Sequence, residues 1–259
     1  MQPLVSIITP MFNNENSIEH TITSVVEQTY PNWELLLVDD ASSDGTLNKI
    51  KPYQNKDPRI KLFTHATNLG AGKARNYGTE MASGAFIAFL DADDIWAPNK
   101  LEVQLHALES SQKDVCFSSY ELIDANGSPL FIKVNALPEL TYNKLLRANY
   151  IGNLTGMYNA YKLGKIYTSN LRKRQDWLLW LDAIKRSHSS AIGIEDTLAY
   201  YRVAKGSLSS GKLGLIKHNY QVYRKGLRFS TIKSSMYLLI FLFEHLFIKR
   251  RLITPIDER

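Results

Sequence analysis

The strongest constraint on the fold of this chain is an apolar run at 85–90 that ends in three closely spaced carboxylates. The run Ala-Phe-Ile-Ala-Phe-Leu leads directly into Asp91-Ala-Asp93-Asp94. A continuous apolar run of this length is typical of a strand buried on both faces of a mostly parallel sheet. Open α/β sheets bind their ligands at the carboxyl ends of such strands. The segment therefore predicts a buried strand that presents carboxylates to a ligand site.

Asp91 and Asp93 form a candidate cation site. Both side chains would point the same way if strand geometry continued through them. Carboxylates that close repel each other unless a cation lies between them. Oxygen ligands suit Mg²⁺ or Mn²⁺, and Mg²⁺ usually binds one or two carboxylates together with substrate phosphates. The alternative is a plain acidic turn after the strand, and this segment alone does not decide between the two.

Strand and helix patterns alternate through the first hundred or so residues. Strands are predicted at 5–9, 34–39, 60–64 and 85–90, and helices at 16–29, 44–50, 70–81 and 100–108. Beyond them, the sequence predicts a strand at 115–119, a helix at 175–185 and a strand at 198–203. This alternation predicts an α/β fold with a mostly parallel, Rossmann-like central sheet flanked by helices. The 259 residues suffice for one large or two small domains of this kind.

Composition argues against several classes of protein. The single cysteine, Cys116, excludes a disulfide framework and fits a reducing compartment. The amino terminus lacks the basic and apolar regions of a signal peptide. The most apolar stretch, at 236–248, is interrupted by Glu244 and His245 and is shorter than the roughly eighteen apolar residues of a spanning helix. We therefore expect a cytoplasmic protein that does not cross the membrane.

Polar residues also follow the other predicted strands. The first strand runs into Thr9 and Pro10, and the second runs into Asp39-Asp40. Carboxyl ends of parallel strands share one edge of a sheet, where a carboxylate can accept a hydrogen bond from a base or a ribose hydroxyl. For the aspartate pair the alternative is turn and capping chemistry, because the residues at 43–44 favour a helix start.

The loop at 68–76 places two glycines and the cations Lys73 and Arg75 at a predicted helix start. Helix amino termini attract phosphates. The loop lacks the Gly-Lys-Ser/Thr ending of a Walker loop, and it is not the dinucleotide motif Gly-x-Gly-x-x-Gly. The loop therefore argues against both Walker-loop proteins and dinucleotide-binding proteins.

Taken in order, the motifs resemble those of the GT-A family 2 glycosyltransferases. They are Ser-Ile-Ile-Thr-Pro at 6–10, Gln-Thr-Tyr-Pro-Asn-Trp-Glu-Leu at 28–35, Val-Asp-Asp-Ala-Ser-Ser-Asp-Gly-Thr at 38–46, Asn-Leu-Gly at 68–70, Ala-Arg-Asn at 74–76 and Leu-Asp-Ala-Asp-Asp at 90–94. The resemblance covers about residues 4–205 and is most specific in its amino-terminal half. It implies a GT-A fold and the transfer of a sugar from a nucleotide-sugar.

The resemblance also implies roles for individual residues. Thr9, Pro10 and Asp40 would line the nucleotide pocket, with Asp40 facing the uracil. Asp93 would bind the metal ion, Mn²⁺ or Mg²⁺. Asp91 would lie near the ribose and complete the metal-binding motif.

Other segments add weaker expectations. Arg75 stands in the family's Ala-Arg-Asn position and would face the diphosphate or the sugar, whereas Lys73 occupies a more variable position. The segment 151–156 falls where relatives build the acceptor pocket. Arg202 or Ser207 would contact a phosphate; the alternative is an ordinary surface strand and turn.

The predicted catalytic base is Asp176. The segment Gln-Asp-Trp-Leu-Leu-Trp at 175–180 resembles the family's acidic-Asp-Trp-x-Leu-Trp segment, with Gln175 where many relatives have Glu. An inverting transfer needs a carboxylate that removes the proton of the acceptor hydroxyl as the oxygen attacks C1. Without the resemblance, the residues alone favour Asp176 as a cap of the helix whose apolar stripe includes Trp177. With it, we expect Asp176 to be the base.

These motifs predict an inverting, metal-dependent glycosyltransferase that moves a hexose or N-acetylhexosamine from a UDP-sugar. The pattern resembles bacterial enzymes of O-antigen and capsule synthesis, which implies a lipid-diphosphate-linked saccharide as acceptor. The rival hypothesis is a non-catalytic nucleotide-sugar-binding or scaffold protein of a glycan-assembly complex. The presence of Asp91, Asp93 and Asp176 argues against that rival. No nucleic-acid-binding module is recognisable, so no nucleic acid is expected as a partner.

The carboxyl-terminal part of the chain is basic. The net charge is +6, and residues 197–243 contain eight Lys or Arg and no Asp or Glu. We divide the chain into a nucleotide-sugar-binding half at 1–110, an acceptor-binding half at 111–205 and a basic helical tail at 206–259. A cationic, aromatic-rich tail suits an anionic membrane surface, which predicts peripheral attachment to the inner face of the cell membrane. The alternative is a solvated helical pair that packs on the domain.

Overall fold

The computed structural model describes residues 2–169, 171–203 and 212–257. The strands are β1 (Val5–Met11), β2 (Trp33–Asp39), β3 (Ile60–Thr64), β4 (Phe86–Phe89), β5 (Ile95–Trp96), β6 (Val115–Ile123), β7 (Pro129–Val134), β8 (Glu139–Leu140), β9 (Met157–Asn159), β10 (Ala191–Arg202) and β11 (Ile253–Pro255). The α-helices are α1 (Ile18–Val26), α2 (Thr46–Lys56), α3 (Ala71–Met81), α4 (Lys100–Ser111), α5 (Tyr142–Arg147), α6 (Ala160–Leu163), α7 (Gln175–Ser187), α8 (Lys212–Gln221) and α9 (Thr231–Phe243). Shorter 3₁₀ or π segments are η1 (Asn153–Thr155), η3 (Val222–Gly226), η4 (Glu244–Ile248) and η5 (Lys249–Leu252).

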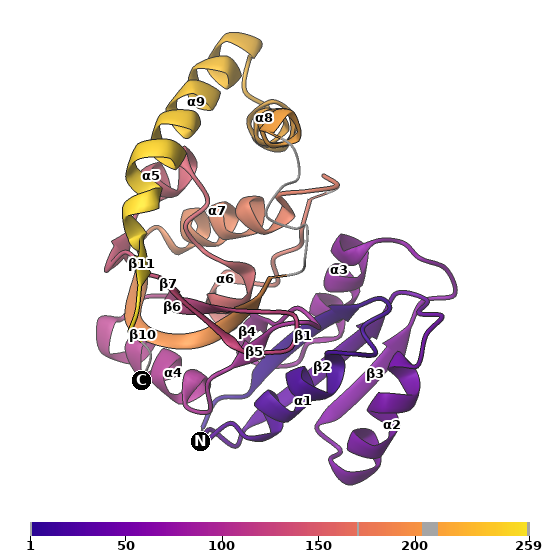
Figure 1. The fold of residues 1–259 in the computed structure, drawn as a ribbon. Helices are drawn as coiled ribbons and strands as arrows, with labels where there is room; N and C mark the ends of the chain where they lie inside the picture. Colours follow the sequence, from indigo (N-terminus) through magenta and orange to yellow (C-terminus); the bar gives the residue numbers. More distant parts are fainter. Residues whose placement is uncertain (1, 170, 204–211, 258–259) are drawn as a thin grey trace.

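The described strands form one sheet with a parallel half and a mainly antiparallel half (Figure 1). Their order is β11-β7-β6-β9-β4-β1-β2-β3, and β10 pairs with β6, β5 and β8. β4, β1, β2 and β3 run parallel, so their carboxyl ends share one edge. The predicted α/β fold with a parallel central sheet is confirmed in this half. The other half adds antiparallel pairs of β6 with β7 and β9.

The central strands β1 and β2 are buried along their whole length because helices cover both faces of the sheet. Alternate residues face opposite sides, as strand geometry requires. Ile7 and Leu35 belong to the apolar cluster that contains α1, whereas Ile8 and Leu36 belong to the cluster that contains α7. This burial on both faces explains the near-continuous apolar sequences of the two strands.

Two element boundaries differ most from the predictions. Helix α2 does not end at residue 50 but continues through Pro52 to Lys56. Tyr53 packs against the core, and its hydroxyl lies 3.2 Å from that of Thr23, so tertiary contacts support a turn that proline disfavours. Strand β10 begins at Ala191 rather than 198 because its first half also pairs in parallel with β6.

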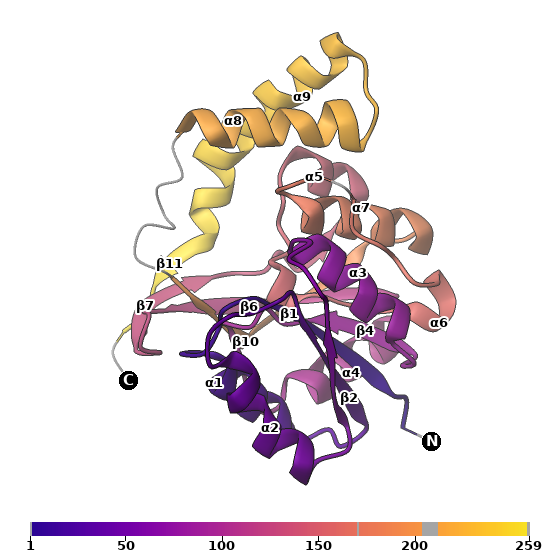
Figure 2. The same cartoon turned by 90° about the vertical axis from the view of Figure 1, so that its right-hand side faces the viewer.

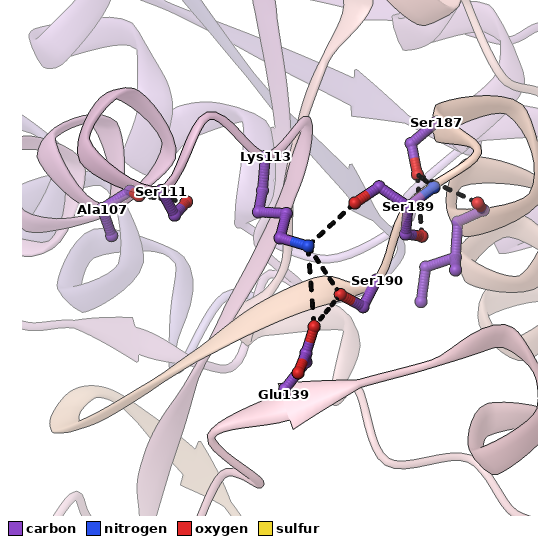
Figure 3. A network of polar contacts seen from close by, with 8 residues as sticks. Ala107, Ser111, Lys113, Glu139, Ser187, Ser189 and Ser190 are labelled. Carbon is purple, nitrogen blue, oxygen red and sulfur yellow. Dashed lines mark hydrogen bonds and ion pairs between the residues drawn. The ribbon is translucent and has the colours of Figure 1, made fainter.

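A polar network joins the amino ends of β6 and β10 (Figure 3). Lys113 Nζ donates to the hydroxyls of Ser189, at 2.9 Å, and Ser190, at 2.8 Å, and lies 3.5 Å from the carboxylate of Glu139. Ser190 also donates to Glu139. The network lies at the sheet edge opposite the predicted site, so its role is to hold β10 beside β6.

Helix α7 forms the centre of the core on one face of the sheet. Trp177 and Trp180 are fully buried. The Trp177 Nε1–H donates to the Leu145 carbonyl at 2.8 Å, and the Trp180 ring lies edge-on to Phe89 at 6.0 Å. A Cβ at Gly156 would lie 2.2 Å from the Trp180 ring, which explains the glycine there. These contacts fix the position of the first turn of α7.

Helices α8 and α9 project from the body of the molecule beyond α5 and α7 (Figures 1 and 2). The Phe241 ring nevertheless lies 5.7 Å from that of Trp177, and buried Glu244 pairs with Lys144. Strand β11 pairs with β7. The carboxyl-terminal segment thus packs in part on the domain.

Within the described residues, one helical stretch, Thr231–Leu252, is long and apolar enough to span a membrane by length and composition. Its mean hydropathy is 1.4 over the qualifying window, of which 17% is buried inside the protein. The expectation that no such stretch exists is therefore wrong. The helix continues through η4 and η5 across Glu244 and His245, which a count of consecutive apolar residues had treated as an interruption.

Candidate functional site

The turn after β4 presents Asp91 and Asp93 at the carboxyl edge of the sheet. The strand ends before Asp91, and the amide of Asp94 donates to the Asp91 carbonyl at 3.0 Å. Strand geometry therefore does not continue through the two aspartates, and the condition under which both would point the same way is not met. Asp91 Oδ1 instead accepts bonds from Arg75 on α3, at 2.7 Å, and from Asn153 on η1, at 3.4 Å. Three segments distant in sequence thus meet at Asp91.

Asp93 and Asp94 differ in burial and in chemistry. Asp94 is completely enclosed, and its carboxylate accepts the Arg202 amide at 2.9 Å. Burial and the charges of Asp93 and Asp91 raise the pKa of Asp94 well above its usual range. Asp93 faces a cavity, and burial followed by the charge of Asp91 raises its pKa. A cation beside Asp93 would offset this repulsion, whereas Asp94 supports the turn.

Arg202 holds the same turn from β10. Its Nε donates to the Asp93 carbonyl at 2.7 Å, and Nη1 donates to the carbonyls of Asp124 and Ala125. The side chain is therefore a buried support for the turn and does not belong to a surface strand. Ser207, the other phosphate-binding candidate, lies outside the described residues.

Asp40 lies at the carboxyl end of the β2 strand and is buried. His65 Nδ1 contacts its carboxylate at 2.8 Å, and the amides of Leu69 and Gly70 donate to it at 2.9 and 2.6 Å. Burial alone would raise the pKa of Asp40, but these hydrogen bonds outweigh it and lower the pKa. Gly70 adopts φ 91°, a conformation that favours glycine. Asp40 therefore organises the glycine-containing loop before α3.

A first cavity of about 510 Å³ brings together most of the residues predicted for the donor site. Pro10, Asp40, Arg75, Asp91 and Asp93 line it. They come from β1, β2, α3 and the turn after β4, so the parallel sheet gathers them at one edge. Open α/β sheets bind ligands at this edge, so the first cavity is a candidate ligand site.

Two predicted donor-site residues lie elsewhere. Thr9 is completely buried within β1 and is not among the residues that line the first cavity. Within the described part of the chain, its hydroxyl has no hydrogen-bond partner. Lys73 lines a neighbouring cavity of about 470 Å³ together with Arg172 and Gln175.

A second cavity of about 400 Å³ contains Asp176 and shares Arg75 and Asp91 with the first. Asp176 lies in the first turn of α7, whose N-cap residue is Arg174, so the aspartate is not the cap. Its Oδ2 accepts a hydrogen bond from Asn149 Nδ2 at 2.7 Å. The dipole of α7 favours an anion at this position.

The second cavity also contains part of the predicted acceptor segment. Residues 151–154 line it, together with Tyr120 and Tyr201. A larger cavity, of about 810 Å³, lies between α4 and the amino-terminal segment and includes none of the predicted site residues among its lining.

Sequence reasoning missed His65, Asn149 and Lys249. His65 directly follows β3, so its place at the carboxyl edge could have been noticed. Asn149 carries no local signal, because it lies in a loop after α5. Lys249 lines the second cavity from the end of the helix that includes α9, a segment interpreted only as a tail.

The acidic residues fit a metal that binds partly through its substrate. Throughout residues 2–169, 171–203 and 212–257, no group of three or more His, Cys, Asp or Glu side chains is placed to hold a metal ion. Asp93 and Asp91 supply two carboxylates beside a cavity. This donor set suits Mg²⁺ or Mn²⁺ when phosphate oxygens complete the coordination.

Comparison with curated proteins identifies close relatives. TuaG of Bacillus subtilis (strain 168), a glycosyltransferase assigned by name to teichuronic acid biosynthesis, is 39% identical over 90% of this chain and 92% of its own. The Escherichia coli enzyme WfgD, named UDP-Glc:alpha-D-GlcNAc-diphosphoundecaprenol beta-1,3-glucosyltransferase, is 41% identical over 85% of each chain.

Solved structures share the fold. S. aureus TarS residues 1–349 in complex with UDP-GlcNAc is similar with a TM-score of 0.72 and 24% identity, over 95% of this chain and 74% of that one. The model of the Glycosyl transferase family 2 matches residues 6–166. This match, the identity to the relatives and the arrangement of the two cavities agree: the chain has the GT-A fold and belongs to glycosyltransferase family 2.

Proposed function

We propose that this protein transfers a hexose or N-acetylhexosamine, with inversion, from a UDP-sugar to a lipid-diphosphate-linked saccharide. One observation supports this most directly: two cavities share Arg75 and Asp91, and Asp176 lines only one of them. The cavity with Asp40 and Asp93 suits the nucleotide-sugar. The cavity with Asp176 suits the acceptor, since a base must meet the acceptor hydroxyl.

The proposed chemistry assigns a role to each group. Asp176 accepts the proton of the acceptor hydroxyl while that oxygen forms a bond to C1 of the donor sugar and the bond from C1 to the UDP oxygen breaks. Because attack and departure occur on opposite faces, an α-linked donor would yield a β-linked product. Arg75, held by Asp91, lies where the two cavities meet and would contact the departing diphosphate or the sugar.

Asp93, with Asp91, would hold Mn²⁺ or Mg²⁺, which when bound supplies positive charge to the diphosphate. Burial, followed by the charge of Asp91, raises the pKa of Asp93, and a bound cation would favour its charged carboxylate. A structural neighbour with 19% identity and a TM-score of 0.69, the mannosyltransferase PcManGT of Pyrobaculum calidifontis, was solved with GDP-Man and Mn²⁺.

UDP-glucose is the first donor to test, because WfgD is named for it and is 41% identical. The same name supports GlcNAc-diphosphate-lipid as the first acceptor. A UDP-hexose donor and a lipid-linked acceptor are therefore the classes that we propose for this chain.

We also propose peripheral attachment to the inner face of the cell membrane. On α9 and η4, apolar side chains at helical spacing are exposed to solvent: Ile232, Met236, Leu239, Phe243, Leu246 and Phe247. Lys233 lies on α9 itself, and Arg224 and Lys225 lie on η3, which contacts α9. An amphipathic surface with nearby cations suits an anionic membrane.

The decisive experiment is a transfer assay with UDP-glucose, other UDP-hexoses and a synthetic GlcNAc-diphosphate-lipid, in the presence of Mn²⁺ or Mg²⁺. Asp176→Asn should bind donor normally and transfer about 10²–10⁴-fold more slowly. The exposed Asp196→Asn is the matched control. Donor binding by the wild type without transfer or hydrolysis of any donor would favour the rival scaffold function.

A further inference from the structure

The wall of the second cavity carries an excess of positive charge. Four cations line it besides Arg75: Arg172, Lys173, Arg174 and Lys249. Among the described residues, Asp91 and Asp176 are the acidic groups in its lining, and Asp91 is already paired with Arg75. One carboxylate therefore faces four cations, a balance that favours an anionic ligand.

Lys249 is half-buried in this wall, as Arg174 is, whereas Arg172 and Lys173 are exposed. The Lys249 ammonium donates to the backbone carbonyl of Asn149 and lies 5.8 Å from the centre of the Tyr150 ring. It forms no ion pair with a carboxylate in the described part of the chain. Burial, followed by the charge of Arg174, lowers the pKa of Lys249 to about 8. Holding an unpaired ammonium there costs free energy that an anionic ligand would offset.

Arg174 is a second cation of this wall, and its backbone conformation is unusual. It is the N-cap residue of α7 and adopts φ 66°, in the left-handed region that residues with a side chain rarely occupy. Its charge is close enough to Lys249 to lower the pKa of that lysine. Two like charges held near each other at a cavity wall, one on a strained backbone, indicate a prepared anion site.

We propose that Lys249 and Arg174 bind the diphosphate of the acceptor, so that the carboxyl-terminal helix completes the acceptor site. This inference rests on the proposed function and names the part of the acceptor that the second cavity recognises. The ligand chemistry is a diphosphate ester joined to the acceptor sugar. The diphosphate of the UDP-sugar is the other possible source of that chemistry.

The position of Lys249 favours the acceptor over the donor. Lys249 and Arg174 line the cavity of Asp176 and are not among the residues that line the cavity of Asp40 and Asp93. The donor diphosphate in one cavity and the acceptor diphosphate in the other would therefore be bound by separate cations.

The helix also provides a path for the lipid. Lys249 directly follows η4, and the exposed side chains of Phe243, Leu246 and Phe247 precede it by less than two helical turns. The exposed apolar side chains of α9 and η4 thus lie within two turns of Lys249 along the helix, a separation that a lipid joined to a bound diphosphate could bridge.

The test measures binding by calorimetry at saturating UDP, so that the donor site is already filled. The first probe is water-soluble GlcNAc-diphosphate with a short alkyl chain. The second is GlcNAc joined to the same chain by a neutral glycosidic bond. Lys249→Gln and Arg174→Gln should each weaken binding of the first probe by about tenfold or more, since charge-assisted hydrogen bonds to phosphate are lost.

The controls separate a ligand role from a structural one. The exposed neighbour Arg250→Gln should bind both probes as the wild type does, and Lys249→Arg should largely retain binding of the diphosphate probe. Lys249→Gln should leave binding of the neutral probe and of UDP unchanged. An equal loss of both probes would overturn the proposal in favour of support for Asn149, and a loss of UDP affinity would assign the cations to the donor.

Failure of this inference is distinguishable from failure of the proposed function. If the wild type binds the diphosphate probe no better than the neutral one, the inference is wrong even when transfer is observed. If the diphosphate probe binds in a manner that depends on Lys249 but no donor is ever transferred, the inference stands as a binding site and the catalytic proposal fails.

Discussion

Asn149 donates a hydrogen bond to the carboxylate of Asp176 at 2.7 Å, which ties the loop after α5 to the first turn of α7. The backbone amide of Ile151 in turn donates to the Asn149 side-chain oxygen at 3.2 Å, and Lys249 donates to the Asn149 carbonyl. Asn149 is therefore held from two sides while it orients Asp176. In the proposed function, a carboxylate fixed in this way would need less rearrangement to meet an acceptor hydroxyl.

Removing that bond should slow transfer without weakening donor binding. Asn149→Ala is expected to lower kcat by about ten- to a hundredfold, because a hydrogen bond to a charged group is worth about 1.5–3 kcal/mol, and to leave the KM for the donor unchanged. Asn149→Asp would place a second carboxylate against Asp176 and move the acidic limb of the pH–rate profile to higher pH. Asn143→Ala, at an exposed position on α5, is the control. An unchanged kcat and pH profile would show that Asn149 does not position the base.

Metal binding should be visible in thermal stability, independently of activity. Mn²⁺ with UDP is expected to raise the Tm of the wild type, by linkage worth about 2.7 kcal/mol at a hundred times Kd. Asp93→Asn should lose the part of the shift that Mn²⁺ adds, and the exposed Asp196→Asn should keep it. Because the pKa of Asp93 is raised above 3.8, the Mn²⁺-dependent shift should also weaken as the pH falls through that raised pKa and the carboxyl is protonated. A full Mn²⁺ effect in Asp93→Asn would place the metal elsewhere.

Glu34 should stabilise the fold in a pH-dependent way. Its buried carboxylate accepts bonds from the Ser6 hydroxyl at 2.6 Å, the Ser83 amide at 2.7 Å and Lys61 at 2.8 Å. Burial alone would raise the pKa of Glu34, but these bonds outweigh it and lower the pKa below 4.5. Glu34→Gln is therefore expected to reduce the free energy of unfolding by about 2 kcal/mol at pH 7.

The lowered pKa of Glu34 determines how its contribution to the free energy of unfolding changes with pH. Since the folded-state pKa of Glu34 is lowered, its stabilisation is present above the unfolded-state value and disappears as the pH falls through the folded-state pKa. The difference between wild type and Glu34→Gln in urea unfolding should accordingly shrink below about pH 4.5. The exposed Glu109→Gln should show little difference at any pH. A pH-independent difference would contradict this account.

Membrane attachment should depend on the exposed apolar face of α9. Leu239 and Phe243 are 68% and 59% exposed, so Leu239→Glu and Phe243→Glu should leave the fold intact and greatly reduce co-sedimentation with anionic vesicles. Tyr161→Glu, which alters an 87% exposed aromatic residue on α6, is the control. Wild-type binding should weaken with salt, because each basic residue near the surface contributes roughly 1 kcal/mol. Equal binding by all variants would show that this face does not contact the membrane.

Point substitutions are preferable here to removal of the tail. Phe241 packs on Trp177 and β11 pairs with β7, so a truncation before α8 would expose the core and leave an edge of the sheet unpaired. Loss of vesicle binding by such a fragment would not distinguish a membrane contact from unfolding.

Much of the parallel half of the sheet and of the first cavity could be predicted from local patterns. The apolar runs of β1, β2 and β4 identify buried strands, and parallel strands place their carboxyl ends on one edge. Pro10, Asp40, Asp91 and Asp93 consequently meet in one cavity, as expected. Thr9 does not line that cavity, because its side chain is enclosed within the buried strand β1.

The strands of the parallel sheet and the polar residues at their ends follow from the amino-acid sequence, because apolar runs and the polar residues after them are local properties of the chain. Which side chains meet Asp176 depends instead on the tertiary structure. Asn149 lies 27 residues before it, and Lys249 reaches the Asn149 carbonyl across 100 residues. Such contacts depend on how α7, the loop after α5 and the carboxyl-terminal helix pack around Trp177, and no periodicity or motif encodes that packing.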